Sequence, residues 1–157
     1  MALRGTILVA PEGMNLFLAG TEAEVEAFLD ALRSDARFAD IIVKRSWSET
    51  QPFARFKVKR KNEIIAFRQD DASPLAGRAP ALAPATLARW LEQGRDDDGR
   101  RVVLLDTRNR CEIEHGAFAG AATLPIDRFT DLPDAIDAMR NSLADATVVS
   151  YCTGGIR

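Results

Sequence analysis

The chain has 157 residues, of which 46% are hydrophobic and 28% are charged, and its formal net charge is −2. This composition is typical of a globular protein, and the mild acidity argues against a basic coat for nucleic acid over the whole surface. No apolar run reaches the roughly 18 residues of a membrane-spanning helix, two cysteines predict no disulfide framework, and one histidine argues against a histidine-based metal site. We therefore expect a cytoplasmic protein outside the membrane, with no metal.

The N-terminal stretch predicts a β-hairpin followed by a helix. Residues 5–10 and 15–20 are rich in β-favouring residues, and a Pro-Glu-Gly turn separates them. Thr21 precedes Glu24 by three residues, which is the spacing of a capping box. Apolar residues then recur at helical spacing and predict a helix over residues 22–34.

A short apolar run at residues 41–44 predicts a strand, and a charged segment at residues 52–67 predicts a strand pair or one broken strand. In a strand, the odd-numbered cations of this segment share a face with Phe53, whereas Phe56 and Val58 face the core. A flat basic row suits RNA phosphates, but lysines on an exposed edge strand also prevent edge pairing. Both interpretations stay open for the basic run, which consists of Arg55, Lys57, Lys59, Arg60 and Lys61.

The C-terminal half predicts a strand–helix–strand unit. Residues 69–83 are rich in Ala and Pro and predict a linker, after which Pro84 starts a short helix. Buried strands are predicted at residues 102–105 and 148–151, with a helix within residues 126–143. Ligands of such units bind beyond the carboxyl ends of the strands. Two polar stretches follow those ends directly, Asp106–Asn109 and Cys152–Arg157.

Cys152 opens a loop, CTGGIR, whose glycines let successive N–H groups point inward and stabilise an anion. Such a loop lowers the pKa of the thiol, and Arg157 is expected to add a positive charge at its far side. Four residues separate Cys152 from Arg157, so the loop is shorter than that of cysteine phosphatases and favours sulfur over a phosphoryl group. The alternative is a buried, inert cysteine, which is the packing role that we expect for Cys111. Trp47 and Trp90 are also expected to pack, and His115 is expected at the surface or in a helix.

Two motifs resemble the rhodanese domain. Residues 102–126 match its first signature through Asp106, Arg108, Glu112, Gly116, Phe118, Gly120, Ala121 and Pro125. CTGGIR is similar to the rhodanese active loop, in which the leading cysteine, here Cys152, becomes a persulfide. In order, GTILVAPEGMN, PFARFKVKRKNEI, DTRN and YCTGGIR resemble the rhodanese-containing tRNA uridine hydroxylases over nearly the whole chain, although Leu16-Phe17 replaces a common Gly-Thr.

The resemblance implies an α/β protein with a ferredoxin-like α+β domain at residues 1–68, a linker at residues 69–83 and a rhodanese α/β domain with a parallel sheet at residues 84–157. It also implies that a strand and a helix precede residue 1, and that a helix with a second cysteine follows residue 157. Both domains are therefore expected to be incomplete in this chain.

The implied activity is oxygen-dependent 5-hydroxylation of the wobble uridine of tRNA, with molecular oxygen as co-substrate and no other evident cofactor. The implied partner is tRNA, bound by the basic run, and no stable protein partner is evident. Asp106 and Arg108 are predicted to frame the loops or to take part directly in the chemistry. A thiosulfate-type sulfurtransferase and a catalytically dead rhodanese binding module stay open as alternatives. The implied catalytic residue is Cys152, and its active-site loop comprises Thr153, Gly154, Gly155, Ile156 and Arg157.

Overall fold

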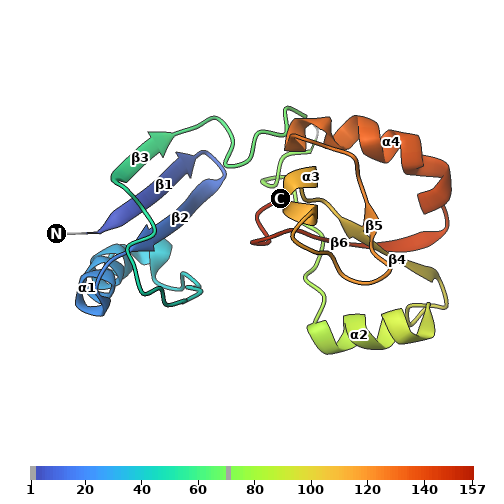
Figure 1. Ribbon diagram of the computed structural model, residues 1–157, viewed down its shortest axis with the longest axis horizontal. Helices are drawn as coiled ribbons and strands as arrows, with labels where there is room; N and C mark the ends of the chain where they lie inside the picture. Colours follow the sequence, from blue (N-terminus) through green and yellow to red (C-terminus); the bar gives the residue numbers. More distant parts are fainter. Residues whose placement is uncertain (1–2, 70–71) are drawn as a thin grey trace. The chain divides into compact units, whose positions relative to one another are not determined.

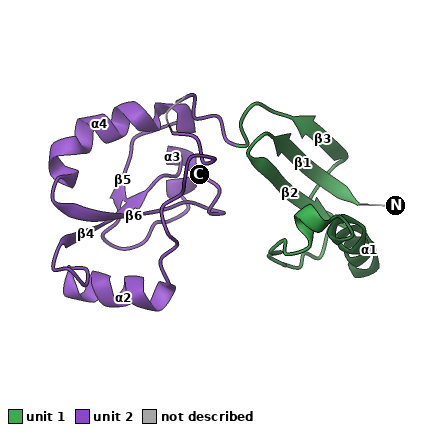
Figure 2. Ribbon diagram, turned by 180° about the vertical axis from the view of Figure 1, so that it is seen from behind, with its two compact units in different colours: residues 1–64 green, residues 65–157 purple. Residues whose placement is uncertain are grey.

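The chain folds into two compact units, Met1–Ile64 and Ile65–Arg157 (Figure 2). The computed structural model describes residues 3–69 and 72–157. Both units combine helices with a small sheet, so the predicted mixed α/β class is confirmed. Within the described ranges no helix is long and apolar enough to cross a membrane. The finer division into two domains and a linker stays a prediction.

Unit 1 contains a three-stranded sheet and one α-helix. The strands lie in the order β2-β1-β3, with β2 antiparallel and β3 parallel to β1 (Figure 1). The predicted hairpin and the helix after it are therefore confirmed. The elements in chain order are β1 (Arg4–Ala10), β2 (Gly13–Ala19), α1 (Glu22–Arg33), the 3-10 helix η1 (Ala36–Phe38) and β3 (Phe56–Arg60).

The capping box at the start of α1 forms as predicted. The backbone N–H and the hydroxyl of Thr21 both donate to Glu24 Oε2 at 3.1 Å, and the Glu24 N–H donates to Thr21 Oγ1 at 3.4 Å. These bonds satisfy N–H groups that a helix start leaves without intrahelical partners. Leu29 is the buried residue of α1, and Leu3 and Ile7 are buried at β1. Together they give unit 1 a small apolar core.

Two expectations about the segment after α1 are wrong. Residues 41–44 form no strand, and Ile42 is 91% exposed, because β-propensity alone does not form a strand without a neighbouring edge to pair with. Phe56 and Val58, expected in the core, are 47% and 61% exposed. Val58 is in register with the buried Ile7, so it does lie on the core side of the sheet. It is nevertheless exposed because β3 is the edge strand.

Unit 2 contains a parallel three-stranded sheet in the order β5-β4-β6. Figure 1 shows this sheet between α4 and α2. The predicted helices and the two predicted strands are confirmed in position, to within a few residues at their ends. The strand at residues 102–105 is buried at its end, but the expected burial of residues 148–151 is wrong, because β6 is an edge strand and Val148 is 39% exposed. The elements are α2 (Pro84–Gln93), β4 (Arg101–Asp106), α3 (Arg110–Ile113), β5 (Ala122–Thr123), the 3-10 helix η2 (Phe129–Asp131), α4 (Leu132–Leu143) and β6 (Ala146–Tyr151).

The core of unit 2 lies between the sheet and α4. Its buried cluster joins β4 and α4 through the segment after β5, and Ile136 and Met139 on α4 pack against it. Phe67 also packs on this cluster, and its ring centroid lies 5.1 Å from that of Phe129. The first residues of unit 2 are therefore anchored to its core. The buried cluster consists of Leu105, Leu124, Ile126 and Leu132.

Gly5 is a position where a side chain must clash. Its φ is 133°, and a Cβ there would lie 1.9 Å from the carbonyl oxygen of Phe17. We predict that Gly5→Ala weakens unit 1 by roughly 1–3 kcal/mol, from strain and overpacking together. Native-state hydrogen exchange of the β1 and β2 amides measures this loss as faster exchange.

Gly13→Ala is the matched control, because Gly13 has φ 139° but a Cβ there meets no atom within 4 Å. It carries the backbone strain without the clash. Equal exchange rates in the two variants would contradict the clash as the reason for glycine at residue 5.

Candidate active site at the carboxyl ends of β4 and β6

The two polar stretches predicted at the strand ends meet in the structure. Asp106, the last residue of β4, is in register with Tyr151, the last residue of β6. Thr107 continues this pairing: its N–H and its hydroxyl both donate to the Tyr151 carbonyl oxygen, at 3.0 and 2.9 Å. The turn after β4 is thus fixed to the residue that directly precedes Cys152.

The loop after β6 curls around the Cys152 sulfur. The Gly155 N–H donates to Cys152 Sγ at 3.1 Å, and Gly155 adopts φ 73°, a conformation that side chains disfavour. Burial raises the pKa of the Cys152 thiol, but the backbone N–H groups of Arg157, Gly154, Gly155 and Ile156 outweigh it. The net effect is a pKa below the ordinary thiol value. The loop therefore favours an anion on this sulfur.

A buried carboxylate holds the strand end from which the loop begins. Asp106 is fully buried, and Arg108 donates to both of its oxygens, Nε to Oδ1 at 2.9 Å and Nη2 to Oδ2 at 2.7 Å. The Tyr151 hydroxyl donates to Oδ2 at 2.6 Å. Burial raises the pKa of Asp106, but these hydrogen bonds lower it further, so the group is a carboxylate. Arg108 also donates to the Gly116 carbonyl oxygen at 2.7 Å, which ties in the segment after α3.

Glu112 is a site residue that residue-by-residue reasoning missed. Its Oε1 accepts from the Thr153 hydroxyl at 2.7 Å and from Arg157 Nη2 at 2.9 Å, while its Oε2 lies 2.7 Å from Arg157 Nη1. The Arg157 guanidinium lowers the pKa of Glu112 to about 2. A signal was present, because Asn109 precedes Glu112 by three residues, and the Asn109 N–H donates to Glu112 Oε2 at 3.0 Å.

Arg157 was expected to present a positive charge at the far side of the loop. The structure instead pairs it with Glu112, and both side chains are largely buried, with exposed fractions of 16% and 25%. The guanidinium is therefore neutralised by a carboxylate. The loop's amides, rather than a free cation, surround the sulfur.

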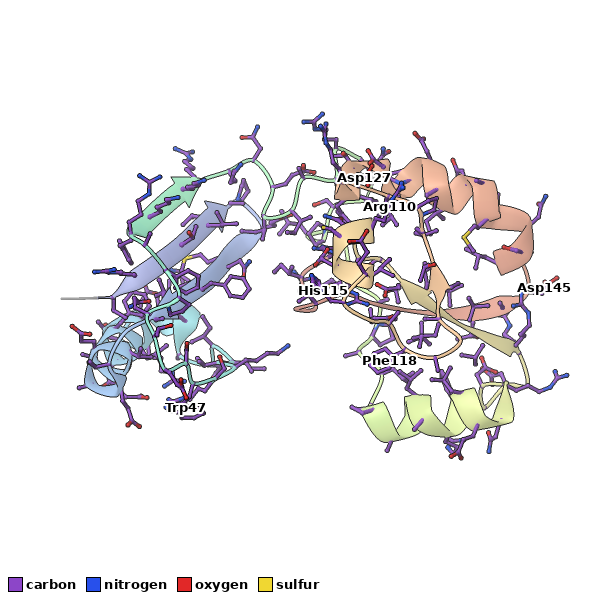
Figure 3. All side chains as sticks on the ribbon, viewed as in Figure 1. Trp47, Arg110, His115, Phe118, Asp127 and Asp145 are labelled. Carbon is purple, nitrogen blue, oxygen red and sulfur yellow. The ribbon has the colours of Figure 1, made fainter. Side chains whose placement is uncertain are left out.

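Phe118 and Tyr151 form an aromatic pair beside this frame. Their ring centroids lie 5.0 Å apart in an edge-to-face arrangement, and the Phe118 N–H donates to the Tyr151 hydroxyl oxygen at 3.3 Å. Phe118 is 62% exposed (Figure 3). The Tyr151 hydroxyl thus accepts one hydrogen bond and donates another to Asp106.

Three other residues were expected to pack or to lie at the surface. Cys111, expected to pack, is exposed on α3, and Trp47, also expected to pack, is 83% exposed (Figure 3). Cys111 lies on the four-residue helix α3, and Trp47 lies in a segment without regular secondary structure. Neither segment places its side chain in a core. His115 is exposed, as expected. Among the described residues no cluster of His, Cys, Asp or Glu has the arrangement of a metal site.

The basic run lies in unit 1 along the edge strand. Its members are exposed except for Lys57, which is partly buried, and none has a carboxylate within 4.0 Å among the described residues. The backbone at both ends of β3 is fixed to β1, through Gly5 N–H to the Arg55 carbonyl at 3.0 Å and Lys61 N–H to the Val9 carbonyl at 2.8 Å. The run therefore has a backbone that is hydrogen-bonded to β1 at both ends, and within residues 3–69 and 72–157 its cationic side chains form no ion pair.

Comparison with known proteins shows which proteins this chain resembles. A family model described as "UPF0176 acylphosphatase like domain" matches residues 1–64. Proteins named tRNA uridine(34) hydroxylase are 62% identical in Xanthomonas campestris pv. campestris (strain 8004) and 58% identical in Bordetella avium (strain 197N). These matches cover 99% and 100% of this chain. The chain is similar to these proteins over almost the whole of its own length.

The matched relatives are longer than this chain. The chain spans 62% of the Xanthomonas protein and 65% of the Bordetella protein. The acylphosphatase-like match covers the residues of unit 1 and agrees with its mixed α/β sheet. The relatives align with nearly every residue of both units.

The loop around Cys152 predicts how this thiol titrates. We expect iodoacetamide to alkylate Cys152 with a pH midpoint below the ordinary thiol value of about 8.5, because the loop amides stabilise the thiolate. Mass spectrometry across a pH series measures both cysteines in one sample, with the exposed Cys111 as internal comparison.

Gly155→Ala strains the loop at φ 73° and should raise the Cys152 midpoint, whereas Gly154→Ala introduces no contact within 4 Å and should change it less. An equal midpoint in wild type and Gly155→Ala would mean that the N–H to sulfur bond does not set the thiol pKa.

Proposed function

We propose that this protein is a tRNA-modifying enzyme that hydroxylates the wobble uridine at C5, with Cys152 as the reactive residue of a rhodanese-type site. The observation that carries the proposal is the loop of backbone N–H groups around the Cys152 sulfur, in a chain 62% identical to a protein named tRNA uridine(34) hydroxylase. Molecular oxygen is the proposed co-substrate, and the cytoplasm, where tRNA is used, is the proposed location.

The chemistry of the loop supports a sulfur anion as the working species. The partial positive charges of the surrounding amides stabilise a thiolate on Cys152 or an anionic outer sulfur of a persulfide. The frame of Asp106, Arg108 and Tyr151 fixes the start of the loop, and the pair of Glu112 and Arg157 fixes its end. The amides are therefore oriented before any substrate arrives. In this proposal Asp106 and Arg108 are loop-framing residues, since they bond to each other, to the Tyr151 hydroxyl and to the Gly116 carbonyl oxygen.

The basic run supports tRNA as the partner. Cations on an edge strand that have no carboxylate partner in the part of the chain that the structure describes suit the phosphates of a folded RNA. Contact with phosphates gives affinity without sequence preference. The choice of the target uridine then falls to the site around Cys152 and to parts of the tRNA that the run does not contact.

The proposed activity is tested in a strain that lacks the gene. We expect 5-hydroxyuridine at the wobble position to disappear from tRNA nucleosides measured by mass spectrometry, and the full-length gene to restore it. Cys152→Ser should fail to restore it, whereas Cys111→Ser, which changes the exposed cysteine, should restore it fully.

Full restoration by Cys152→Ser would show that the reaction does not need the Cys152 thiol. Unchanged tRNA together with strong thiosulfate-to-cyanide transfer would instead establish the sulfurtransferase alternative. Unchanged tRNA with no persulfide on Cys152 would leave a binding module.

The basic run is tested by the salt dependence of tRNA binding. We expect Lys59→Gln with Lys61→Gln to weaken binding and to lower the slope of log affinity against log salt by about 0.7 for each lost phosphate contact. The matched control is Arg78→Gln with Arg33→Gln, which removes two exposed cations outside the run. An identical salt slope in wild type and the lysine variant would exclude the run as a phosphate-binding surface.

A further inference from the structure

The charge state of the Cys152 loop depends on one ion pair. Both Glu112 oxygens engage Arg157, with Oε1 accepting from Nη2 at 2.9 Å and Oε2 2.7 Å from Nη1. Oε1 also accepts from the Thr153 hydroxyl at 2.7 Å. Glu112 therefore contacts the residue directly after the cysteine and the last residue of the loop.

The other cation of α3 does not compete for this carboxylate. Arg110 and Asp127 lie together in Figure 3, and Arg110 Nε is 3.3 Å from Asp127 Oδ1. Arg110 Nη2 also donates to the Pro125 carbonyl oxygen at 3.2 Å. Glu112 therefore forms its ion pair with Arg157, and its negative charge neutralises the positive charge of the loop's last residue.

The remaining positive potential comes from backbone dipoles, which carry partial charges. The N–H groups of residues 154–157 favour a negative charge on Cys152. A second negative charge in the loop would face the Glu112 carboxylate without a free guanidinium to balance it. A phosphate or sulfate dianion would add that second charge, whereas a thiolate or persulfide anion adds only one.

We propose that Glu112, by neutralising Arg157, restricts the loop around Cys152 to singly charged anions and excludes doubly charged oxyanions. Glu112 is in this role a specificity-determining residue that acts through Arg157. The inference rests on the proposed function insofar as that function places a sulfur anion on Cys152. It implies that a dianionic sulfur donor such as thiosulfate is a poor ligand of this loop, which disfavours a thiosulfate-type sulfurtransferase.

The test compares two tetrahedral anions that differ in charge, sulfate and methanesulfonate, at constant ionic strength. Each is titrated for its ability to slow the alkylation of Cys152 by iodoacetamide in the full chain. In wild type we expect methanesulfonate to protect at a lower concentration than sulfate. Stronger protection by sulfate in wild type would overturn the proposal, and this comparison needs no variant to fold.

Glu112→Gln keeps an oxygen that can accept from Thr153 and Arg157 but removes the charge. We expect sulfate to protect this variant at a concentration roughly tenfold lower than wild type, because Arg157 is no longer neutralised. The gain should vanish in the double variant Glu112→Gln with Arg157→Met. Glu112→Asp, which keeps the charge, should show no gain.

Glu114→Gln is the matched control, because it removes the same charge from an exposed residue at the end of α3. A gain of sulfate protection in Glu114→Gln, or its survival in the double variant, would falsify the proposal. The readout is anion binding and not hydroxylation. Persistence of 5-hydroxyuridine in the strain without the gene would therefore overturn only the proposed function, and unchanged sulfate protection in Glu112→Gln would overturn only this inference.

Discussion

The carboxylate of Asp106 is the interaction on which the site depends. It is fully buried at the end of β4, and a buried charge is costly unless it is paired and hydrogen-bonded. Arg108 and the Tyr151 hydroxyl supply those bonds, and each also contacts the segment at residues 116–118. Removing one partner would leave an uncompensated charge, so the turn after β4 and the end of β6 are held as one frame.

The loop around Cys152 follows from this frame. A backbone N–H stabilises an anion only if it is already oriented, because reorientation during the reaction costs free energy. The Thr107 hydrogen bonds to the Tyr151 carbonyl fix the start of the loop, and the ion pair between Glu112 and Arg157 fixes its end. The Cys152 sulfur thus belongs to a loop that is held at both ends.

The sequence predicted the elements that depend on local chemistry. The capping box at Thr21 and Glu24, the positions of β4 and β6 and the helix before β6 all have strong patterns over short distances. The meeting of the DTRN and CTGGIR stretches was also predictable, because parallel strands of one unit end at the same edge. The strand expected at residues 41–44 failed because propensity does not supply a pairing edge.

Contacts between residues distant in the chain were harder to predict. The Glu112 to Arg157 pair spans 45 positions, and spacing alone cannot distinguish a free cation in a loop from a neutralised one. The exposure of Phe56 and Val58 depends on β3 being an edge strand, which is a property of the whole sheet. These features depend on strand order and on contacts between distant residues, which a local sequence pattern does not determine.

The lowered pKa of Cys152 has a chemical cost. A thiolate is oxidised by peroxide more readily than a thiol, first to a sulfenic acid and then irreversibly to a sulfinic acid. The same amides that lower the pKa of Cys152 therefore also make its sulfur more sensitive to oxidation.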